Sequence, residues 1–185
     1  MTAAPAVFLD RDGVLNCTVI RDGRPYPPRS LQELTLIPDA KQSCHDLREA
    51  GFLLIMVTNQ PDIARGAASA ESVAEINERL RIDLGLHEVC VCPHDDADRC
   101  ACRKPAPGML LESTRRWGLD LSSSFMVGDR WRDIAAGRSA GCRTVFIDYG
   151  YLERRPDSPD AQVKSLGEAA RWILAMRREE LSSHA

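Results

Sequence analysis

Short apolar runs alternate with longer amphipathic stretches along most of the chain. The apolar runs predict strands at residues 7–10, 52–58, 87–91, 125–127 and 143–147. Stretches with apolar residues three or four positions apart predict helices at residues 39–50, 70–84, 107–117, 130–139 and 165–179. The run at 52–58 is almost continuously apolar, which is typical of a strand covered by helices on both faces.

Strands that alternate with helices predict a parallel sheet with right-handed crossovers. We therefore expect an α/β fold with three layers, a Rossmann-like sheet between two layers of helices. The 185 residues fit one domain spanning 1–185, with no internal repeat or low-complexity linker. The intervals between Asp12 and Thr58 and between Asn59 and Lys104 leave no room for a large cap domain. The cap is therefore expected to be minimal, with residues 21–36 and a cysteine-rich loop supplying substrate contacts.

Polar side chains follow the predicted strands. Asp10 and Asp12 end the first strand in an Asp-x-Asp-Gly turn, residues 58–60 (Thr-Asn-Gln) follow the second, and Asp129 follows the fourth. In parallel sheets, ligands bind outside the carboxyl ends of the strands. These side chains are therefore expected to meet at one edge, together with Lys104 from a loop.

The residues that meet there suit phosphoryl transfer. Asp10, Asp129 and a backbone carbonyl form an oxygen-rich set that suits Mg²⁺, with Asp12 also counted among the candidate ligands. Lys104 supplies a compact positive charge for a carboxylate nucleophile and a transferring phosphoryl group. An aspartyl-phosphate would form and then be hydrolysed by water, with Asp12 as general acid and base. An Asp-x-Asp-Gly turn by itself is weak evidence, because Asp and Gly are ordinary turn residues.

Four of the seven cysteines lie between residues 90 and 102, in a polar loop rich in Asp. An odd number of cysteines without a secretory signal argues against a disulfide framework. The loop offers a Cys₃His set, which suits a structural Zn²⁺ ion with four protein ligands. The set is Cys92, His94, Cys100 and Cys102. Cys90 is left outside it, because it would point to the opposite face of a continuing strand.

Charge and hydropathy narrow the classes of partner. Lys and Arg total 24 against 27 Asp and Glu, a net charge of −3 with no clustered basic stretch, which argues against nucleic-acid binding. The longest apolar stretch is too short to span a bilayer, and the first residues do not resemble a secretory signal. We therefore expect a cytoplasmic protein without membrane contact. A monomer is expected because no long exposed apolar face stands out.

Four motifs together resemble those of the haloacid dehalogenase-type phosphatases, in order and spacing, over residues 7–148. They are Asp10-Arg11-Asp12-Gly13, Thr58-Asn59-Gln60, Arg103-Lys104-Pro105 and Gly128-Asp129-(x)3-Asp133. The resemblance implies Asp10 as nucleophile, Asp12 as acid and base, and Asp129 as Mg²⁺ ligand. It also implies that Thr58 and Lys104 stabilise the phosphoryl group. The residues expected to bind substrate are Arg11, Asn59, Gln60, Arg65, Arg103 and Arg130. No role is assigned to Asp133.

Within that superfamily the cysteine loop and residues 63–66 are similar to those of the D-glycero-D-manno-heptose 1,7-bisphosphate phosphatases and the related histidinol phosphatases. The resemblance implies a small phosphorylated metabolite as substrate, foremost heptose 1,7-bisphosphate losing its 7-phosphate. Arg65 suits a second phosphate better than an amine. The chain departs from the heptose enzymes at Pro61 and Asp62, where Ser and Gly are usual, and Asp62 adds negative charge near that second phosphate.

Two alternatives stay open. Histidinol phosphate, or another small phosphomonoester, could be the substrate, since the short cysteine loop resembles that group as well. A protein of a different class, a non-catalytic binding module stabilised by metal, would be expected to have lost one of the four central residues. All four are present: Asp10, Asp12, Lys104 and Asp129.

Overall fold

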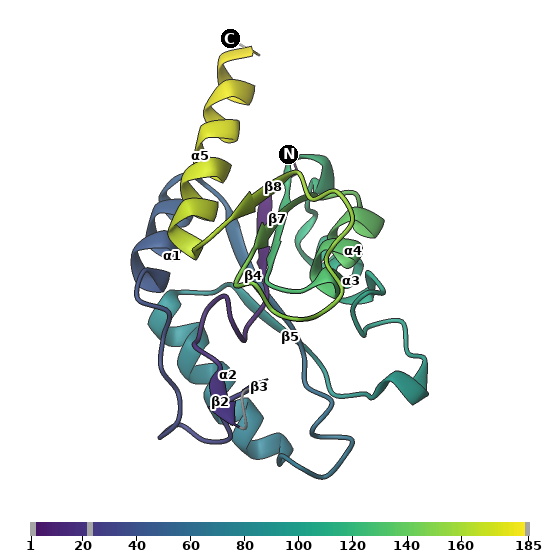
Figure 1. Ribbon diagram of the computed structural model, residues 1–185. Helices are drawn as coiled ribbons and strands as arrows, with labels where there is room; N and C mark the ends of the chain where they lie inside the picture. The colour runs from purple at the N-terminus through teal and green to yellow at the C-terminus, as the bar shows by residue number, and fades with distance from the viewer. Residues whose placement is uncertain (1–2, 22–23, 184–185) are drawn as a thin grey trace.

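The fold is built on a sheet of six parallel strands (Figure 1). The computed structural model describes residues 3–21 and 24–183. The strands lie in the order β5-β4-β1-β6-β7-β8. Their bounds are β1 Ala6–Leu9, β4 Leu53–Asn59, β5 Glu88–Cys92, β6 Phe125–Gly128, β7 Arg143–Ile147 and β8 Ala161–Val163. The first strand of the chain is therefore central, as in other doubly wound α/β folds.

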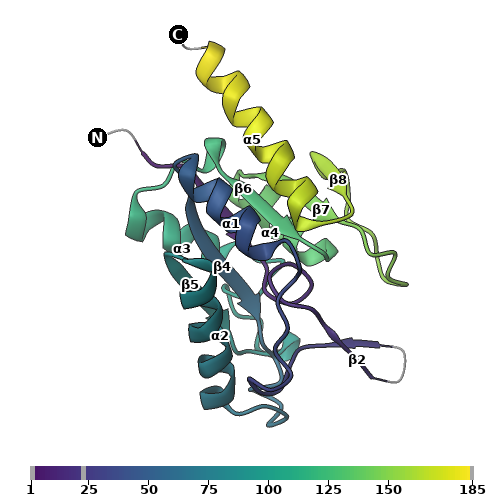
Figure 2. The same cartoon turned by 90° about the vertical axis from the view of Figure 1, so that its left-hand side faces the viewer.

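Helices cover both faces of the sheet, so the three predicted layers are confirmed (Figures 1 and 2). One face carries α1 (Ala40–Glu49), α2 (Ala70–Leu84) and α5 (Leu166–Ser183). The other carries α3 (Gly108–Trp117) and α4 (Trp131–Ala140). The upper part of α5 extends well beyond the sheet (Figure 2).

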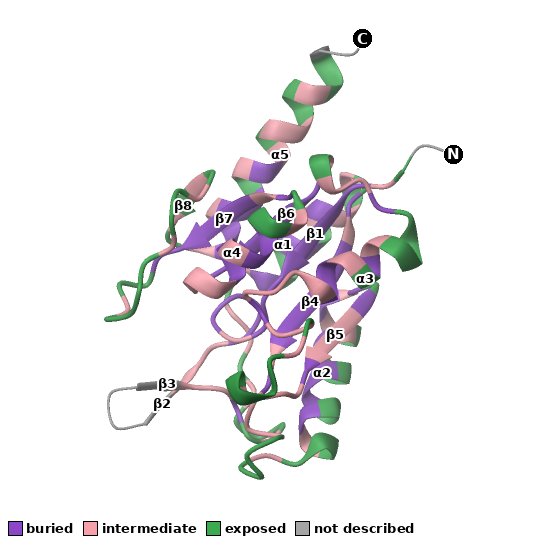
Figure 3. Cartoon of the chain, turned by 90° about the vertical axis from the view of Figure 1, so that its right-hand side faces the viewer, coloured by how far each residue is buried: buried purple, intermediate pink, exposed green. Residues whose placement is uncertain are grey.

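Two hydrophobic layers hold these elements together, because successive strand residues point to opposite faces. On β1, Val7 and Leu9 pack toward α1 and α5, whereas Phe8 packs toward α3. All three side chains are fully buried, and each such burial contributes about 1.5–3 kcal/mol. The strands are the most deeply buried part of the molecule (Figure 3).

The predicted elements form within a few residues of their expected ends. The helix predicted at 70–84 has those bounds, because the Ser69 hydroxyl caps its first turn and Gly85 ends it in a left-handed conformation. Three short strands were not predicted. They are β8 and the hairpin formed by β2 (Val19–Arg21) and β3 (Arg24–Tyr26). Each has only three residues, too few to show a hydrophobic period.

The carboxyl ends of β1, β4, β5 and β6 meet at one edge of the sheet, which the loop before β2 and the loop after β5 overhang (Figure 3). No separate cap domain is present in the described part of the chain. Organisation as a single domain stays a prediction. Among the described residues, every helix is too short or too polar to cross a membrane.

Candidate active site

A cleft of about 340 Å³ opens at this edge and gathers most of the predicted site residues. Five segments far apart in the sequence contribute to it. Its walls are formed by Asp10, Asp12, Thr18, Tyr26, Pro27, Thr58, Asn59, Gln60, Pro61, Asp62, Arg65, Arg103, Lys104, Arg130, Trp131, Arg132, Asp133 and Glu153. Of the sequence-predicted catalytic and substrate-binding residues, Arg11 alone is missing from these walls.

Lys104 is the centre of the buried polar network. Its ammonium Nζ donates to Asp10 Oδ1 at 2.7 Å and to the Val57 carbonyl oxygen at 2.7 Å, and it lies 2.6 Å from Asp133 Oδ1. The side chain is only 2% exposed. Burial lowers the pKa of Lys104, but Asp10 and Asp133 outweigh it and raise the pKa above its ordinary value. Lys104 is therefore a permanently charged group beside the Asp10 carboxylate.

Asn59 fixes the main chain at Lys104. Its side-chain amide donates to the Lys104 carbonyl oxygen at 3.0 Å and accepts from the Lys104 N–H at 3.1 Å. Because both ends of the amide are occupied, Asn59 positions Lys104. Asn59 also lines the cleft, and its contact with the substrate stays a prediction.

Asp12 lies in a shell of hydrogen-bond donors. Asn16 Nδ2 donates to its Oδ1 at 3.0 Å, and Gln60 Nε2 and Arg11 Nε donate to its Oδ2 at 2.9 and 3.1 Å. Gln60 Nε2 also donates to the Thr58 hydroxyl at 2.8 Å. These contacts fix the orientation of the carboxylate at the wall of the cleft, as an acid and base group requires.

The Arg11 side chain does not reach the cleft, so its predicted contact with the substrate stays a prediction that no side-chain geometry supports. Its side chain is fully buried, forms an ion pair with Asp12 and donates from Nη1 to Asn77 Oδ1 at 3.0 Å. Asn77 lies on α2, so Arg11 ties the loop after β1 to that helix. Sequence could not show this, because charged residues are rarely buried.

Three carboxylates, those of Asp10, Asp129 and Asp133, come within 4.8 Å of one another and form an acidic cluster. Burial raises the pKa of Asp10 to about 6, against the lowering effect of Lys104. Burial, and then Asp10 and Asp133, raise the pKa of Asp129 well above its ordinary value. Both Asp129 carboxylate oxygens are buried without a hydrogen-bond partner in the described residues. Buried, unpartnered oxygens beside a second carboxylate are the donor set that a Mg²⁺ ion prefers.

Gly13 allows this approach. The residue has a φ of 88°, a left-handed value that favours glycine, and a Cβ added there would overlap the Asp129 carboxylate. The turn after β1 therefore packs directly against the loop after β6.

The acidic cluster differs from the predicted magnesium ligands at one position. The Asp12 carboxylate lies outside it, and Asp133 lies inside. Asp133 is nevertheless fully engaged, because its Oδ1 contacts Lys104 and its Oδ2 accepts from the Arg130 N–H at 3.0 Å. Asp133 thus positions Lys104 and caps α4, a role that the sequence left unassigned.

The predicted zinc ligands are brought together in the loop after β5. The Sγ atoms of Cys92 and Cys102 lie 3.2 Å apart, and each is 3.6 Å or less from Cys100 Sγ. His94 Nδ1 lies 3.3 Å from Cys102 Sγ. Tetrahedral Zn²⁺ with Zn–S bonds of about 2.3 Å needs sulfurs about 3.8 Å apart, close to this spacing. Cys90 lies apart and contacts the Ser113 hydroxyl.

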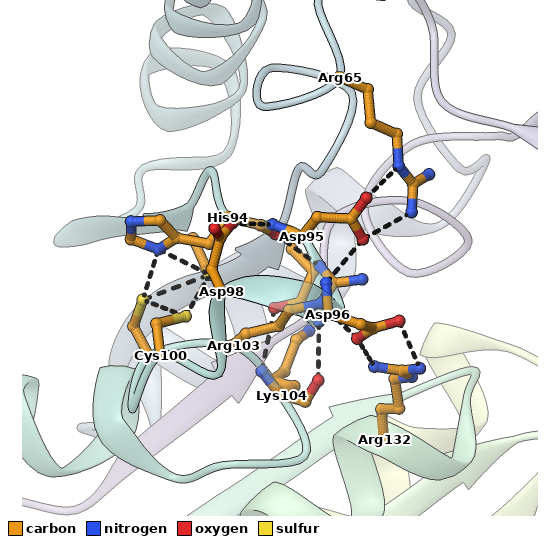
Figure 4. Close-up of polar contacts among 12 residues, drawn as sticks. Arg65, His94, Asp95, Asp96, Asp98, Cys100, Arg103, Lys104 and Arg132 are labelled. Carbon is orange, nitrogen blue, oxygen red and sulfur yellow. Dashed lines mark hydrogen bonds and ion pairs between the residues drawn. The ribbon is translucent and has the colours of Figure 1, made fainter.

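Arginines that line the outer part of the cleft pair with carboxylates of the loop after β5 (Figure 4). Arg65 donates to both oxygens of Asp95, at 2.6 and 2.8 Å. Arg103 donates to Asp96 at 2.8 Å. Both carboxylates belong to the loop after β5 that carries three of the four predicted zinc ligands, residues 93–102, which we call the zinc-ligand loop. This loop therefore orders the guanidinium groups.

Two further arginines come from the start of α4 and its flank. Arg130 pairs with Glu153 and lies over the Tyr151 ring, with 5.3 Å between its Cζ and the ring centroid. Arg132 donates to both oxygens of Asp96. Sequence reasoning missed Arg132, because its partner is 36 positions away and no local pattern marks it.

Comparison with known proteins fits this geometry. A family model described as HAD-hydrolase-like, where HAD stands for haloacid dehalogenase, matches residues 101–169. The D-glycero-beta-D-manno-heptose-1,7-bisphosphate 7-phosphatase of Yersinia pestis is 35% identical over 93% of this chain and 90% of its own length. The chain belongs to the HAD-like hydrolases. The predicted family, and with it the enzyme class of phosphatases, is thereby confirmed.

Other HAD-like relatives agree. The D-glycero-D-manno-heptose-1,7-bisphosphate 7-phosphatase of Thermosynechococcus vestitus is 35% identical over 91% of this chain and 95% of its own length. The crystal structure of the D,D-heptose 1,7-bisphosphate phosphatase of B. bronchiseptica, complexed with magnesium and phosphate, has a TM-score of 0.79 and 29% identity. It covers 93% of this chain and 99% of that one. HAD phosphatases use Mg²⁺, and the Cys/His cluster of this chain is compatible with zinc.

Proposed function

We propose that the protein is a Mg²⁺-dependent phosphatase that converts D-glycero-D-manno-heptose 1,7-bisphosphate to the 1-phosphate. The observation that carries the reaction class is the buried Asp10 carboxylate, paired with Lys104 and adjoining Asp129. The names of the relatives support the substrate. Both relatives are named heptose 1,7-bisphosphate 7-phosphatases, and this chain matches them over 90% and 95% of their length.

The metal would be held by Asp10 and Asp129, and its charge would compensate the carboxylates and the phosphate. Asp12, whose carboxylate is engaged elsewhere, would contribute through its backbone carbonyl. The zinc ion would be held by the Cys₃His set. With four protein ligands, that site leaves no open position for catalysis.

The free oxygen of Asp10 would attack phosphorus, and the bond to the sugar oxygen would break as Asp12 donates a proton to it. Water would then attack the aspartyl-phosphate while Asp12 accepts a proton, which releases inorganic phosphate and restores Asp10. Lys104 offsets the negative charge on both reacting groups. Thr58 lines the same wall and offers its hydroxyl to the phosphoryl oxygens, whereas the Gln60 amide donates to Asp12 and to Thr58 and would position these two side chains.

At the outer cleft, Arg65, Arg103 and Arg130 are the proposed contacts for the rest of the substrate. The cleft volume of about 340 Å³ suits a small phosphorylated sugar. The negative charge of Asp62, which departs from the usual sequence, lies against Arg65 at 3.6 Å. Arg65 thus offsets part of this charge, although Asp95 shares the same guanidinium group. Action as a monomer in the cytoplasm, without nucleic-acid or membrane partners, remains a prediction.

The test is phosphate release by the purified protein with Mg²⁺ over a small panel. The panel contains both anomers of heptose 1,7-bisphosphate, fructose 1,6-bisphosphate, histidinol phosphate and an aryl phosphate. We expect kcat/KM for one heptose anomer to exceed the others by about a hundredfold, a difference of about 2.7 kcal/mol. Asp10→Asn, which keeps the size of the side chain, is expected to abolish release. Preference for histidinol phosphate would overturn the substrate, and undiminished release by Asp10→Asn would overturn the mechanism.

A further inference from the structure

The two guanidinium groups of Arg103 and Arg132 converge on one oxygen. Arg103 Nε and Arg132 Nη1 donate to Asp96 Oδ1 at 2.8 and 2.6 Å, and Arg132 Nη2 donates to Asp96 Oδ2 at 3.1 Å. The arginines come from the loop after the zinc ligands and from α4, and Figure 4 shows both reaching Asp96. A single carboxylate thus joins two segments of the cleft.

The charges of this cluster do not cancel. Two guanidinium groups share one hydrogen-bonded carboxylate, which leaves a net positive charge on these three side chains. Each guanidinium has five N–H donors, and the described residues occupy two hydrogen bonds of each. Donors remain for an incoming anion.

The cations, rather than the carboxylate, face the cleft. Arg103 and Arg132 line it, whereas Asp96 does not. The Asp96 side chain is also the most solvent-exposed of the three, at 56%, against 32% for Arg132 and 11% for Arg103. Arg132 is also supported by the Trp131 ring, with 5.2 Å between its Cζ and the ring centroid. The pair is therefore held in place before any ligand arrives.

Arg65, the residue that the sequence favours for a second phosphate, has the opposite balance. Its guanidinium binds Asp95 in a bidentate pair and lies 3.6 Å from Asp62. Two carboxylates around one cation leave a net negative charge. A phosphate dianion at Arg65 would meet the negative charges of Asp95 and Asp62, whereas at Arg103 and Arg132 it finds an unbalanced positive charge.

We infer that Arg103 and Arg132, held together by Asp96, form a second phosphate-binding site in the cleft, and that Arg132 determines the preference for substrates with two phosphate groups. The inference rests on the proposed function, in which the 7-phosphate lies at Asp10. The 1-phosphate then lies between the two guanidinium groups. Asp96 acts as a positioning residue, because it keeps the cations together despite their repulsion.

The experiment measures binding by calorimetry in the Asp10→Asn background, which blocks turnover. The ligands are heptose 1,7-bisphosphate and heptose 7-phosphate, with Mg²⁺ present. We expect the bisphosphate to bind about tenfold or more tightly than the 7-phosphate, and Arg132→Gln to remove that advantage. Arg138→Gln is the matched control, because Arg138 lies on the same helix, is not part of the cleft and contacts the Asp157 carbonyl.

Three results would overturn the site: equal affinity for the two ligands, an equal loss of both affinities in Arg132→Gln, or the same loss in Arg138→Gln. If Arg65→Gln removes the advantage and Arg132→Gln does not, the second phosphate lies at Arg65. If Arg132 had only a structural role, Arg132→Gln would lower the affinity for both ligands to the same extent. The proposed function is read separately, from phosphate release by the unmodified protein. If the unmodified protein released no phosphate but still bound the bisphosphate more tightly, the proposed function would be wrong and the second phosphate-binding site would be retained.

Discussion

Replacing Lys104 by Met tests whether this lysine balances the acidic cluster. The change removes the ammonium group and keeps most of the volume of the side chain. Lys104 is fully buried, so its contacts with Asp10 and Asp133 are hardly screened by solvent. Removing one partner of a buried ion pair typically costs about 3–5 kcal/mol, because the other charge stays buried and unpaired. We expect a loss of that size in the free energy of unfolding.

Urea unfolding in buffer without added Mg²⁺ measures this loss, and chelators are left out so that bound zinc is retained. Lys164→Met is the control, because Lys164 pairs with Asp148 but is 68% exposed, and exposed pairs contribute about 0–1 kcal/mol. Adding Asp10→Asn to Lys104→Met is expected to restore part of the stability. A loss no larger than that of the control would refute the role of Lys104 as counter-charge.

Acidification provides a second readout. A carboxyl whose pKa is raised on folding takes up its proton at higher pH in the folded protein, so stability falls as pH rises through its folded pKa. For Asp10 the window runs from its ordinary 3.8 to about 6. Lys104 lowers this pKa, so Lys104→Met is expected to extend the window to higher pH. Recovery of stability on acidification should then begin above about pH 6. An unshifted profile would contradict the coupling.

Two further predictions concern the metals. Asp129→Asn is expected to raise the melting temperature in Mg²⁺-free buffer, because it removes an unpartnered buried carboxylate. The same change is expected to abolish the rise in melting temperature on adding Mg²⁺. A variant that still gains melting temperature with Mg²⁺ would exclude Asp129 as a ligand. Cys100→Ser is expected to lower the zinc content measured by elemental analysis and to expose residues 95–99 to limited proteolysis, since loss of one thiolate weakens a tetrahedral site. Cys142→Ser is the control, because Cys142 lies in the core away from the loop; equal zinc content in the two variants would contradict the ligand set.

The sequence predicts the sheet and the residues at its edge well, because both depend on local patterns. Apolar runs followed by polar residues identify β1, β4 and β6, and parallel pairing brings their ends together. The helix α5 ends four residues later than expected, at Ser183 rather than at residue 179, since no Gly or Pro marks its end. Boundaries without a capping residue are therefore the least predictable.

Pairings between distant side chains cannot be predicted in this way. Whether Arg11 is buried against α2 or reaches into the cleft depends on the path of the loop after β1, which the sequence does not specify. The partner of Arg65 depends likewise on the fold of the zinc-ligand loop. The sequence identifies the chemical groups at this site, whereas their charge balance emerges only from the three-dimensional arrangement.

Because β1 is central in the sheet, the nucleophile and the proposed substrate contacts lie on parts of the fold that differ in stability. Asp10 follows a strand whose neighbours β4 and β6 are themselves paired on both sides, so its backbone is protected from local opening. Arg65, Arg103 and Arg132 instead depend on carboxylates of one surface loop, where substitutions are tolerated. Under the proposed function, changes of these carboxylates would alter the choice of substrate without touching the nucleophile. The nucleophile Asp10 and the carboxylates that hold the proposed substrate contacts therefore lie in different parts of the chain.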